Sequence, residues 1–269
     1  MTPKERMLNA YCGRPSDRPA VAPELWTYYP AKLLGVDMIA FEREVPFHQA
    51  LMQAFAHFDC EGWGIVFGGG GAAPDVETRS EERWIDDDTL EVSSRTRTPA
   101  GAFTRRQRFH RDEPSWPVER PIKDFVRDLP AWEAATFGGA PEGLDPDPIR
   151  AAWEEVGERY LLEGWLGVPF FDTVGGAFDG GLEAAVVALF EHEAEWERLR
   201  ERTTDHLVRR ARTLCERTPL ESFCIGCSWS CNSLLGPDLW RRWDKPGIRA
   251  VAEELHRHGR LLHVHFHGR

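Results

Sequence analysis

The sequence has few cysteines, no excess of basic residues and no long apolar run, and each absence excludes a class of protein. Its 269 residues contain 33 Lys and Arg against 44 Asp and Glu, which gives a formal net charge of −11. Nucleic-acid binding needs a basic face that releases counterions, so we expect no nucleic-acid partner. No window approaches the roughly 20 apolar residues that cross a bilayer, and no apolar signal-peptide core follows the N-terminus. We therefore expect a cytoplasmic protein without a membrane partner.

The small number of cysteines and the absence of one glycine motif argue against two further classes of protein. Six cysteines in a chain of this length are too sparse for a disulfide scaffold and suit a reducing compartment. No Gly-x-Gly-x-x-Gly motif follows the first predicted strand, which leaves a dinucleotide-binding fold with little support. Three of the cysteines nevertheless lie between Cys224 and Cys231, and this clustering needs an explanation.

Apolar runs alternate with helical patterns along the chain. The apolar runs predict buried strands at residues 19–24, 62–68, 164–171, 219–225 and 261–266. The helical spacings cover residues 47–58, 122–132, 148–161, 181–190, 193–217 and 237–258. Strands separated by helices predict parallel βαβ units, which belong to a doubly wound sheet or a barrel, and we favour the barrel. Alternating residues over 82–111 predict an inserted antiparallel hairpin, and Gly68–Gly71 predicts a mobile loop.

Histidine alternates with apolar residues at the C-terminus, from His263 to His267. Alternate side chains of a strand share a face, and in a parallel barrel the three imidazoles would face the interior and its C-terminal mouth. Alternate residues lie ~6.6 Å apart at Cα, so neighbouring imidazoles can share an ion and the outer two cannot. We predict that His265 and His267 bind zinc and that His263 lies one layer deeper. The alternative is that these histidines bond to neighbouring carboxylates.

The cysteine cluster lies at the end of the fourth predicted strand, next to the histidine strand in a sequential barrel. Cys227 or Cys231 could therefore complete a two-histidine metal site. The alternative is that both are small apolar thiols packed in a turn at the strand end.

Other candidate residues carry weaker signals. Glu24 ends the first predicted strand and is our candidate catalytic residue, with a structural salt bridge as the alternative. Arginines concentrate on the hairpin, where they could steer a polyanionic substrate or form a solvated edge. Asp86–Asp88 is expected to be a solvated turn. The predicted substrate-binding residues are Arg105, Arg108, Trp26 and Asn232.

The order of these elements resembles the uroporphyrinogen decarboxylase superfamily, which also contains cobalamin-dependent methyltransferases that use zinc to activate a thiol. The resemblance runs over essentially the whole chain and depends on the order of short segments: Arg6–Ala10, Asp17–Pro19, Thr98–Gly101, Pro121–Asp124, Gly167–Phe170, Leu235–Trp240 and His265–Gly268. The last of these is similar to the family's His-x-Cys-Gly zinc motif, with His267 in place of the cysteine. This replacement keeps a ligand type but lowers the negative charge donated to zinc.

Two departures argue against authentic uroporphyrinogen decarboxylation. The decarboxylases have an Arg-Gln-Ala-Gly-Arg stretch that binds substrate carboxylates, where this chain has Pro23–Thr27. They also have a catalytic aspartate after the second strand, where this chain has Gly68–Gly71. The methyltransferase-like branch is therefore better supported.

The resemblance implies an α/β fold of the TIM (β/α)8-barrel type, in a single domain over residues 1–269. Only five strand–helix units are predicted, so about three of the eight are missing, together with the family's third zinc ligand, a cysteine. We therefore expect a fragment or truncated product. Residues 261–266 would then form an edge strand through which the chain aggregates or pairs as a homodimer, without turnover.

The resulting first hypothesis is a zinc-dependent methyltransferase. His265 and His267 would hold zinc, and a small-molecule thiol deprotonated there would accept a methyl group from a corrinoid or corrinoid protein. The alternative enzyme is a carboxy-lyase that acts on a carboxylated tetrapyrrole through the hairpin arginines. A third possibility is a tetrapyrrole- or corrinoid-binding module without catalysis.

Overall fold

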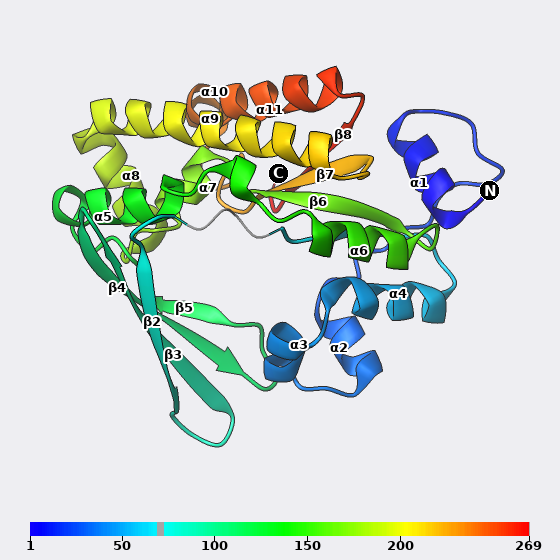
Figure 1. The fold of residues 1–269 in the computed structure, drawn as a ribbon, viewed down its shortest axis with the longest axis horizontal. Coiled ribbons are helices and arrows are strands. Elements are labelled where there is room, and N and C mark those ends of the chain that lie inside the picture. The colour runs from blue at the N-terminus through cyan, green and yellow to red at the C-terminus, as the bar shows by residue number, and fades with distance from the viewer. Residues whose placement is uncertain (69–72, 269) are drawn as a thin grey trace.

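The computed structural model of the protein describes residues 1–68 and 73–268 and shows a mixed α/β fold with two four-stranded sheets (Figure 1). The parallel sheet has the strand order β1-β6-β7-β8, with β1 at Trp63–Val66, β6 at Leu161–Gly167, β7 at Ser222–Cys227 and β8 at Leu261–Phe266. The antiparallel sheet has the order β2-β3-β4-β5, with β2 at Glu77–Trp84, β3 at Thr89–Thr98, β4 at Gly101–His110 and β5 at Trp116–Glu119.

Helices surround the parallel sheet and link it to the antiparallel one (Figure 1). The N-terminal helices are α1 at Pro3–Tyr11, α2 at Tyr28–Leu34, α3 at Met38–Glu44 and α4 at Phe47–Phe58. The middle of the chain forms α5 at Phe125–Phe137, a short 3-10 turn at Pro141–Gly143, α6 at Asp147–Val156, α7 at Phe170–Gly175 and α8 at Gly181–Glu191. The C-terminal helices are α9 at Glu193–Arg217, α10 at Pro237–Trp243 and α11 at Lys245–Arg257. None of the described helices is long and apolar enough to span a bilayer.

Four of the five predicted parallel strands are confirmed, and they lie side by side in the expected order. The strand predicted at 19–24 is wrong, because this segment has no regular structure. Pro19 and Pro23 lack the N–H that a ladder requires. The segment is held instead by the buried Glu61 carboxylate, which accepts a hydrogen bond from the Val21 backbone N–H at 2.9 Å and pairs with the Arg18 guanidinium at 2.6 Å.

Two predicted boundaries are also corrected. The strand predicted at 164–171 begins earlier, at Leu161, and gives way to α7 at Phe170 after Pro169. The helix predicted at 237–258 is two helices, α10 and α11, because Pro246 cannot donate its backbone hydrogen bond and crowds the carbonyl of the preceding turn.

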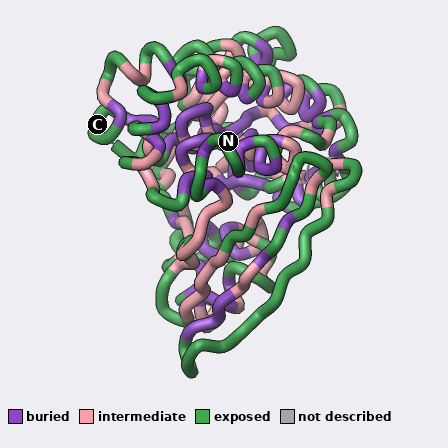
Figure 2. Tube along the Cα trace, turned by 90° about the vertical axis from the view of Figure 1, so that its left-hand side faces the viewer, coloured by how far each residue is buried: buried purple, intermediate pink, exposed green. Residues whose placement is uncertain are grey.

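The inserted hairpin is confirmed as β3 and β4, and it is part of a larger sheet than the sequence predicted. β2 pairs along all of its length with β3, although every β2 residue is exposed (Figure 2). A strand that buries neither face has no apolar alternation, which explains why β2 was not predicted. The predicted mobile loop at Gly68–Gly71 falls, after Gly68, outside the described residues.

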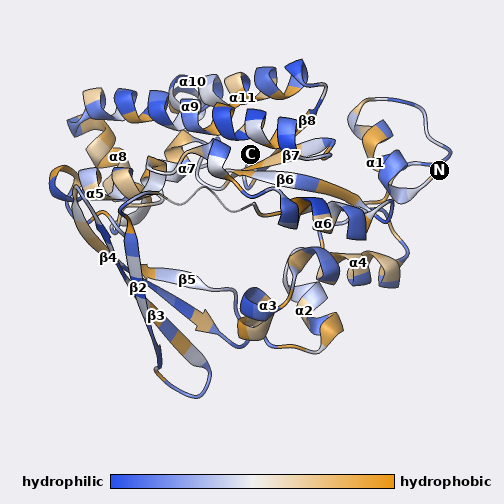
Figure 3. Cartoon of the chain, viewed as in Figure 1, coloured by the Kyte–Doolittle hydropathy of each residue, from blue (hydrophilic) through white to orange (hydrophobic). Residues whose placement is uncertain are grey.

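The main core lies between the parallel sheet and its helices. Phe223 and Ile225 of β7 and the half-buried Leu262 and Val264 of β8 pack against buried residues of α9 and α11, including Leu207, Leu214, Val251 and Leu255. The other side of α9 is largely hydrophilic (Figure 3). The side chains on one face of the parallel sheet therefore pack against the helices, and the alternate side chains project to the opposite face.

The parallel sheet is strongly curved, so that its two edge strands approach one another on that opposite face. The Trp63 ring of β1 lies 4.5 Å from the His263 ring of β8, centroid to centroid, although β6 and β7 separate the two strands. Neighbouring strands are about 4.8 Å apart, so a flat sheet would place β1 and β8 about 14 Å apart. We refer to this concave side as the inner face.

Candidate functional site

The inner face carries a mixture of polar and aromatic side chains from adjacent strands. β6 contributes Glu163, β7 contributes Ser222 and Cys224, and β8 contributes His263 and His265. Glu163 pairs in register with Ser222, and Cys224 pairs with His263 two residues further along β7, so these residues occupy two successive levels of the same face. The prediction that the histidines share a face opposite Leu262 and Val264 is confirmed by these contacts.

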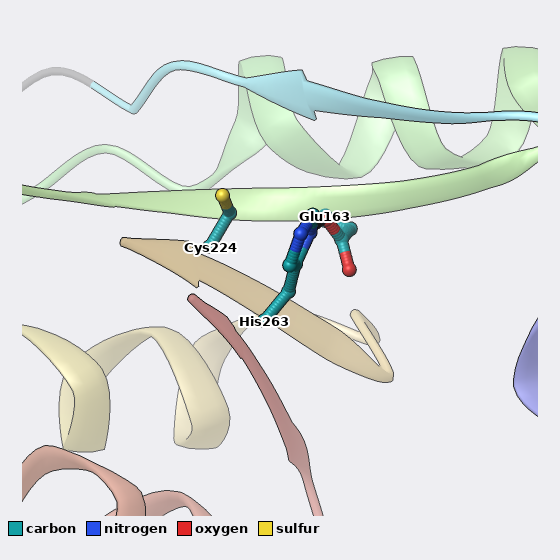
Figure 4. A group of neighbouring side chains, drawn as sticks. All are labelled: Glu163, Cys224 and His263. Carbon is teal, nitrogen blue, oxygen red and sulfur yellow. Dashed lines mark hydrogen bonds and ion pairs between the residues drawn. The ribbon is translucent and has the colours of Figure 1, made fainter. Parts of the chain in front are cut away.

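Glu163, Cys224 and His263 form one compact group (Figure 4). One potential ligand atom from each residue lies within 4.8 Å of the other two, and no other group of this kind occurs in residues 1–68 and 73–268. The His263 Nδ1 atom lies 2.9 Å from Glu163 Oε2, and the Ser222 hydroxyl donates to Glu163 Oε1 at 2.7 Å. Glu163 and Ser222 are completely buried and Cys224 is 1% exposed. His263 thus occupies the deeper layer that the sequence predicted, bonded to a carboxylate.

Burial raises the pKa of two groups in and next to this cluster, Cys224 and Tyr11. Burial, followed by the neighbouring Glu163 carboxylate, raises the pKa of the Cys224 thiol far above its usual range. The same two causes raise the pKa of Tyr11, whose hydroxyl lies 3.4 Å from His263 Nδ1. Both groups are therefore protonated at neutral pH in the metal-free protein. Tyr11 and Trp63 cover His263 from two sides through edge-on ring contacts.

His265 and His267 lie beyond this layer, at the carboxyl end of β8. Their ring centroids are 4.7 Å apart, with an interplanar angle of 88°. Glu24 Oε1 lies 3.6 Å from His265 Nε2, so the structure brings the predicted catalytic carboxylate beside a predicted metal ligand. Burial lowers the pKa of His265; Glu24, the next largest influence, opposes this shift, and His267 adds a smaller decrease. The neutral imidazole is the form that has a lone pair free for a metal.

The two candidate cysteine ligands lie in different surroundings. Cys227 is completely buried in the core between the sheet and the helices, and its carbonyl accepts a hydrogen bond from the His267 backbone N–H at 3.1 Å. Cys231 is buried next to the last described residue: a Cβ added to Gly268 would lie 2.5 Å from its Sγ atom. Of the two thiols, Cys231 is thus placed beside the His265–Gly268 segment.

Asp172 of α7 belongs to the same end of the sheet and was not predicted. Its carboxylate accepts three backbone hydrogen bonds from the turn after β7, from the N–H groups of Ser228, Trp229 and Ser230 at 3.0, 2.8 and 2.8 Å. Burial raises the pKa of Asp172, and these bonds and the nearby His267 oppose the increase. Asp172 therefore fixes the turn that carries Cys231.

A cleft of about 650 Å³ opens between the antiparallel sheet and α7, and Asp172 lines it together with Arg105, Arg106 and Arg120. Arg105 makes no ion pair within the described part of the chain, whereas Arg106 pairs with Glu119 at 2.8 Å. Arg120 stacks on Trp229, with its guanidinium carbon 5.3 Å from the ring centroid. The cleft is therefore cationic on the side of the antiparallel sheet, although the protein as a whole is acidic.

The four predicted substrate-binding residues do not lie together. Arg108 does not line the cleft with Arg105, since it binds Glu91 at 3.1 Å through its Nε atom. Asn232 lines a separate cavity of about 390 Å³ with Cys231, Phe266 and Gly268. Trp26 packs edge-on against Phe47 and lies 5.7 Å from the Trp63 ring.

The turn at Asp86–Asp88 is exposed, as predicted.

Sequence reasoning missed Glu163 and Asp172, and each had a recognisable signal. Glu163 is a lone acidic residue inside the apolar run Leu161–Leu166, and a charged residue is seldom buried without a partner. Asp172 follows Pro169, which cannot donate to a central ladder and therefore marks the end of the strand and the start of another element.

Comparison with known proteins adds one finding about the fold. No protein-family model matches the sequence, and neither does any curated protein. Among solved structures, the chain is similar to a methyltransferase from Methanosarcina mazei, with a TM-score of 0.60 and 14% sequence identity. The similarity covers 99% of this chain and 70% of that one. The two proteins therefore share a fold.

Proposed function

We propose that the protein is a zinc-dependent methyltransferase of the uroporphyrinogen decarboxylase superfamily, which transfers a methyl group between a corrinoid and a small-molecule thiol. The observation that carries this proposal is the pair of imidazoles, His265 and His267, side by side at the carboxyl end of β8, with the Glu24 carboxylate next to His265. The fold shared with a methyltransferase supports it. We further propose that residues 1–269 form one domain and that the curved parallel sheet is part of a TIM-type barrel.

The residues at this end of the sheet supply zinc ligand types, and their side chains would have to move onto the ion, because no three of their potential ligand atoms in the described part of the chain lie within 4.8 Å of one another. Two imidazoles and a carboxylate or thiolate are a common zinc ligand set, and catalytic sites keep a further position open for substrate. His265 and His267 would hold the ion, with Cys231 as the nearer candidate for a third ligand. Zinc bound there would lower the pKa of a coordinated substrate thiol, which would make the thiolate the methyl acceptor.

The protein's own residues would position the imidazoles and the substrate. Glu24 lies within reach of His265 Nε2 and would orient that ring, as carboxylates beside metal-bound histidines commonly do. Asp172 holds the turn that carries Cys231. Arg105 has no carboxylate partner in the described chain and would bind an anionic group of a substrate in the 650 Å³ cleft.

The carboxy-lyase alternative has weaker support. It depends on the hairpin arginines as a cationic surface, but Glu91 neutralises part of that surface by contacting the guanidinium groups of Arg83, Arg106 and Arg108 at 3.1–3.7 Å. Arg105 is left as the hairpin arginine that lines the cleft without an ion pair among described residues. Arg95 and Arg97 also make no ion pair among the described residues, but they line a separate cavity of about 480 Å³ and not this cleft.

Zinc content and methyl transfer test the proposal together. We expect His265→Ala and His267→Ala each to lose one zinc equivalent per chain, measured by elemental analysis after gel filtration, and to lose methyl transfer from a methylcorrinoid to a thiol. His256→Ala, an exposed histidine of α11, is the matched control and should keep the metal and the activity. Full zinc in both site variants, with the fold intact by circular dichroism, would overturn the proposal.

A further inference from the structure

Three strands converge on a second set of side chains that the proposed transfer reaction does not use. Glu163, Cys224 and His263 come from β6, β7 and β8 and project from adjacent strands onto the inner face (Figure 4). They lie one layer below His265, whose ring centroid is 6.2 Å from that of His263. A carboxylate, a thiolate and an imidazole are the three side-chain ligand types that zinc takes in proteins.

The spacing of this group is close to that of a coordination sphere. Bonds of 2.0–2.3 Å to a tetrahedral ion place ligand atoms about 3.3–3.7 Å from one another. The three potential ligand atoms here all lie within 4.8 Å of one another, so small side-chain movements would bring them onto one ion. The ordered β-ladders on both sides of Cys224 hold the three backbones in register, which makes the group preorganised.

The charge of the layer also favours a cation. Glu163 is completely buried, and its contacts are the Ser222 hydroxyl, His263 and the Tyr11 hydroxyl. Burying a carboxylate costs free energy unless a positive charge compensates it. A divalent cation bound by Glu163, a deprotonated Cys224 and a neutral His263 would have no net charge, because two negative ligands balance it. Binding would release the thiol proton to solvent, without any oxidant or reductant.

We propose that Glu163, Cys224 and His263 form a closed site for a zinc-class divalent cation, which links β6, β7 and β8 below the His265–His267 pair. Ser222 and Tyr11 would orient the carboxylate and the imidazole, since their hydroxyl groups already contact them. Enclosure by Tyr11 and Trp63 gives the ion a structural role. The site does not depend on the proposed methyl transfer, because it shares no residue with that reaction.

Cobalt(II) titration tests this site through the sulfur ligand. Protein stripped of metal with a chelator is titrated with Co²⁺, and the thiolate-to-cobalt charge-transfer absorption is followed. Cys231→Ser serves as the parent for this test, because it removes any thiolate band that a metal at His265 and His267 could give. In that background we expect one thiolate–cobalt band that is lost when Cys224→Ser is added and kept when Cys215→Ser, a matched buried thiol of α9 outside the group, is added. No band in Cys231→Ser at saturating Co²⁺, or a band that persists in Cys231→Ser/Cys224→Ser, would overturn the proposal.

Zinc stoichiometry gives a second readout if Cys224→Ser folds poorly. The double variant His265→Ala/His267→Ala should retain one zinc per chain, bound by Glu163, Cys224 and His263. Glu163→Gln keeps the side-chain volume and the hydrogen bond from Ser222, and we expect it to weaken zinc binding more than about 100-fold in competition with a chromophoric chelator, since even indirect ligand partners contribute 10–100-fold. Unchanged affinity in Glu163→Gln contradicts the site, whatever the outcome for His265 and His267.

Discussion

Two carboxylates, one beside each sheet, have pKa values shifted in opposite directions by their surroundings. Asp244 lies between α10 and α11 beside the parallel sheet and is 1% exposed, and burial raises its pKa to about 7. Glu91 lies on β3 of the antiparallel sheet among arginines, and its pKa is lowered, with Arg108 as the largest cause. Glu91 is itself only 4% exposed. Burial without a cation favours the protonated acid, and arginines next to a buried carboxylate favour the charged form.

The two sheets also differ in how far their side chains are buried. The parallel sheet and its helices bury many large side chains, whereas β2 and much of β4 remain exposed (Figure 2). We therefore expect the free energy of unfolding to depend mainly on apolar contacts around the parallel sheet. Surface ion pairs should matter little in the antiparallel sheet.

Truncating one large aromatic side chain in each sheet gives the largest contrast in unfolding free energy. Phe223 of β7 is completely buried, and Phe223→Ala should lower the free energy of unfolding by about 3–5 kcal/mol, through lost burial and the resulting cavity. Trp84 of β2 is 50% exposed and contacts Arg111, so Trp84→Ala should cost under about 1 kcal/mol. Urea unfolding followed by circular dichroism measures both. Equal losses would show that the antiparallel sheet carries as much of the core.

A pH series on Asp244 tests the contrast between the carboxylates. The native acid keeps its proton up to about pH 7, whereas the unfolded one loses it near 3.8. The stabilisation is therefore complete below about pH 4 and declines as pH rises towards 7, by up to about 1.4 kcal/mol per pH unit. Asp244→Asn keeps an acceptor for the Phe171 N–H and should remove this decline. It should thus gain stability relative to wild type between pH 4.5 and 6.5.

The control for that series is Asp238→Asn, whose side chain is 95% exposed. We expect its unfolding free energy to follow the wild-type pH dependence. If Asp244→Asn also follows it, the buried carboxyl does not titrate as described, and the contrast with Glu91 fails.

The smallest effect is expected at an ion pair that links α3 to the antiparallel sheet. Arg43 and Glu82 are 2.5 Å apart, with side chains 34% and 49% exposed. Solvent screens such a pair, so Glu82→Gln should change the unfolding free energy by less than about 1 kcal/mol, and 1 M NaCl should abolish the difference. A larger, salt-independent loss would mean that this pair fixes the position of the sheet.

The sequence by itself determined the elements that depend on local periodicity. The apolar spacing of α4 and α9 predicted both helices at their observed limits, and β8 was predicted residue for residue. The alternation in β8 also predicted that its histidines share a face, because side chains of a strand alternate whatever the strand packs against.

Only the tertiary structure decided which residues meet. Residues 19–24 resembled a strand, but their prolines cannot pair and Glu61 holds them in an irregular path. β2 has no apolar face, and it forms because its backbone pairs with β3 along its whole length. Glu163, Cys224 and His263 are far apart in the chain, and they converge through the register of β6, β7 and β8. Local patterns specify an element and its faces, whereas contacts between elements depend on pairing and curvature, which no short segment encodes.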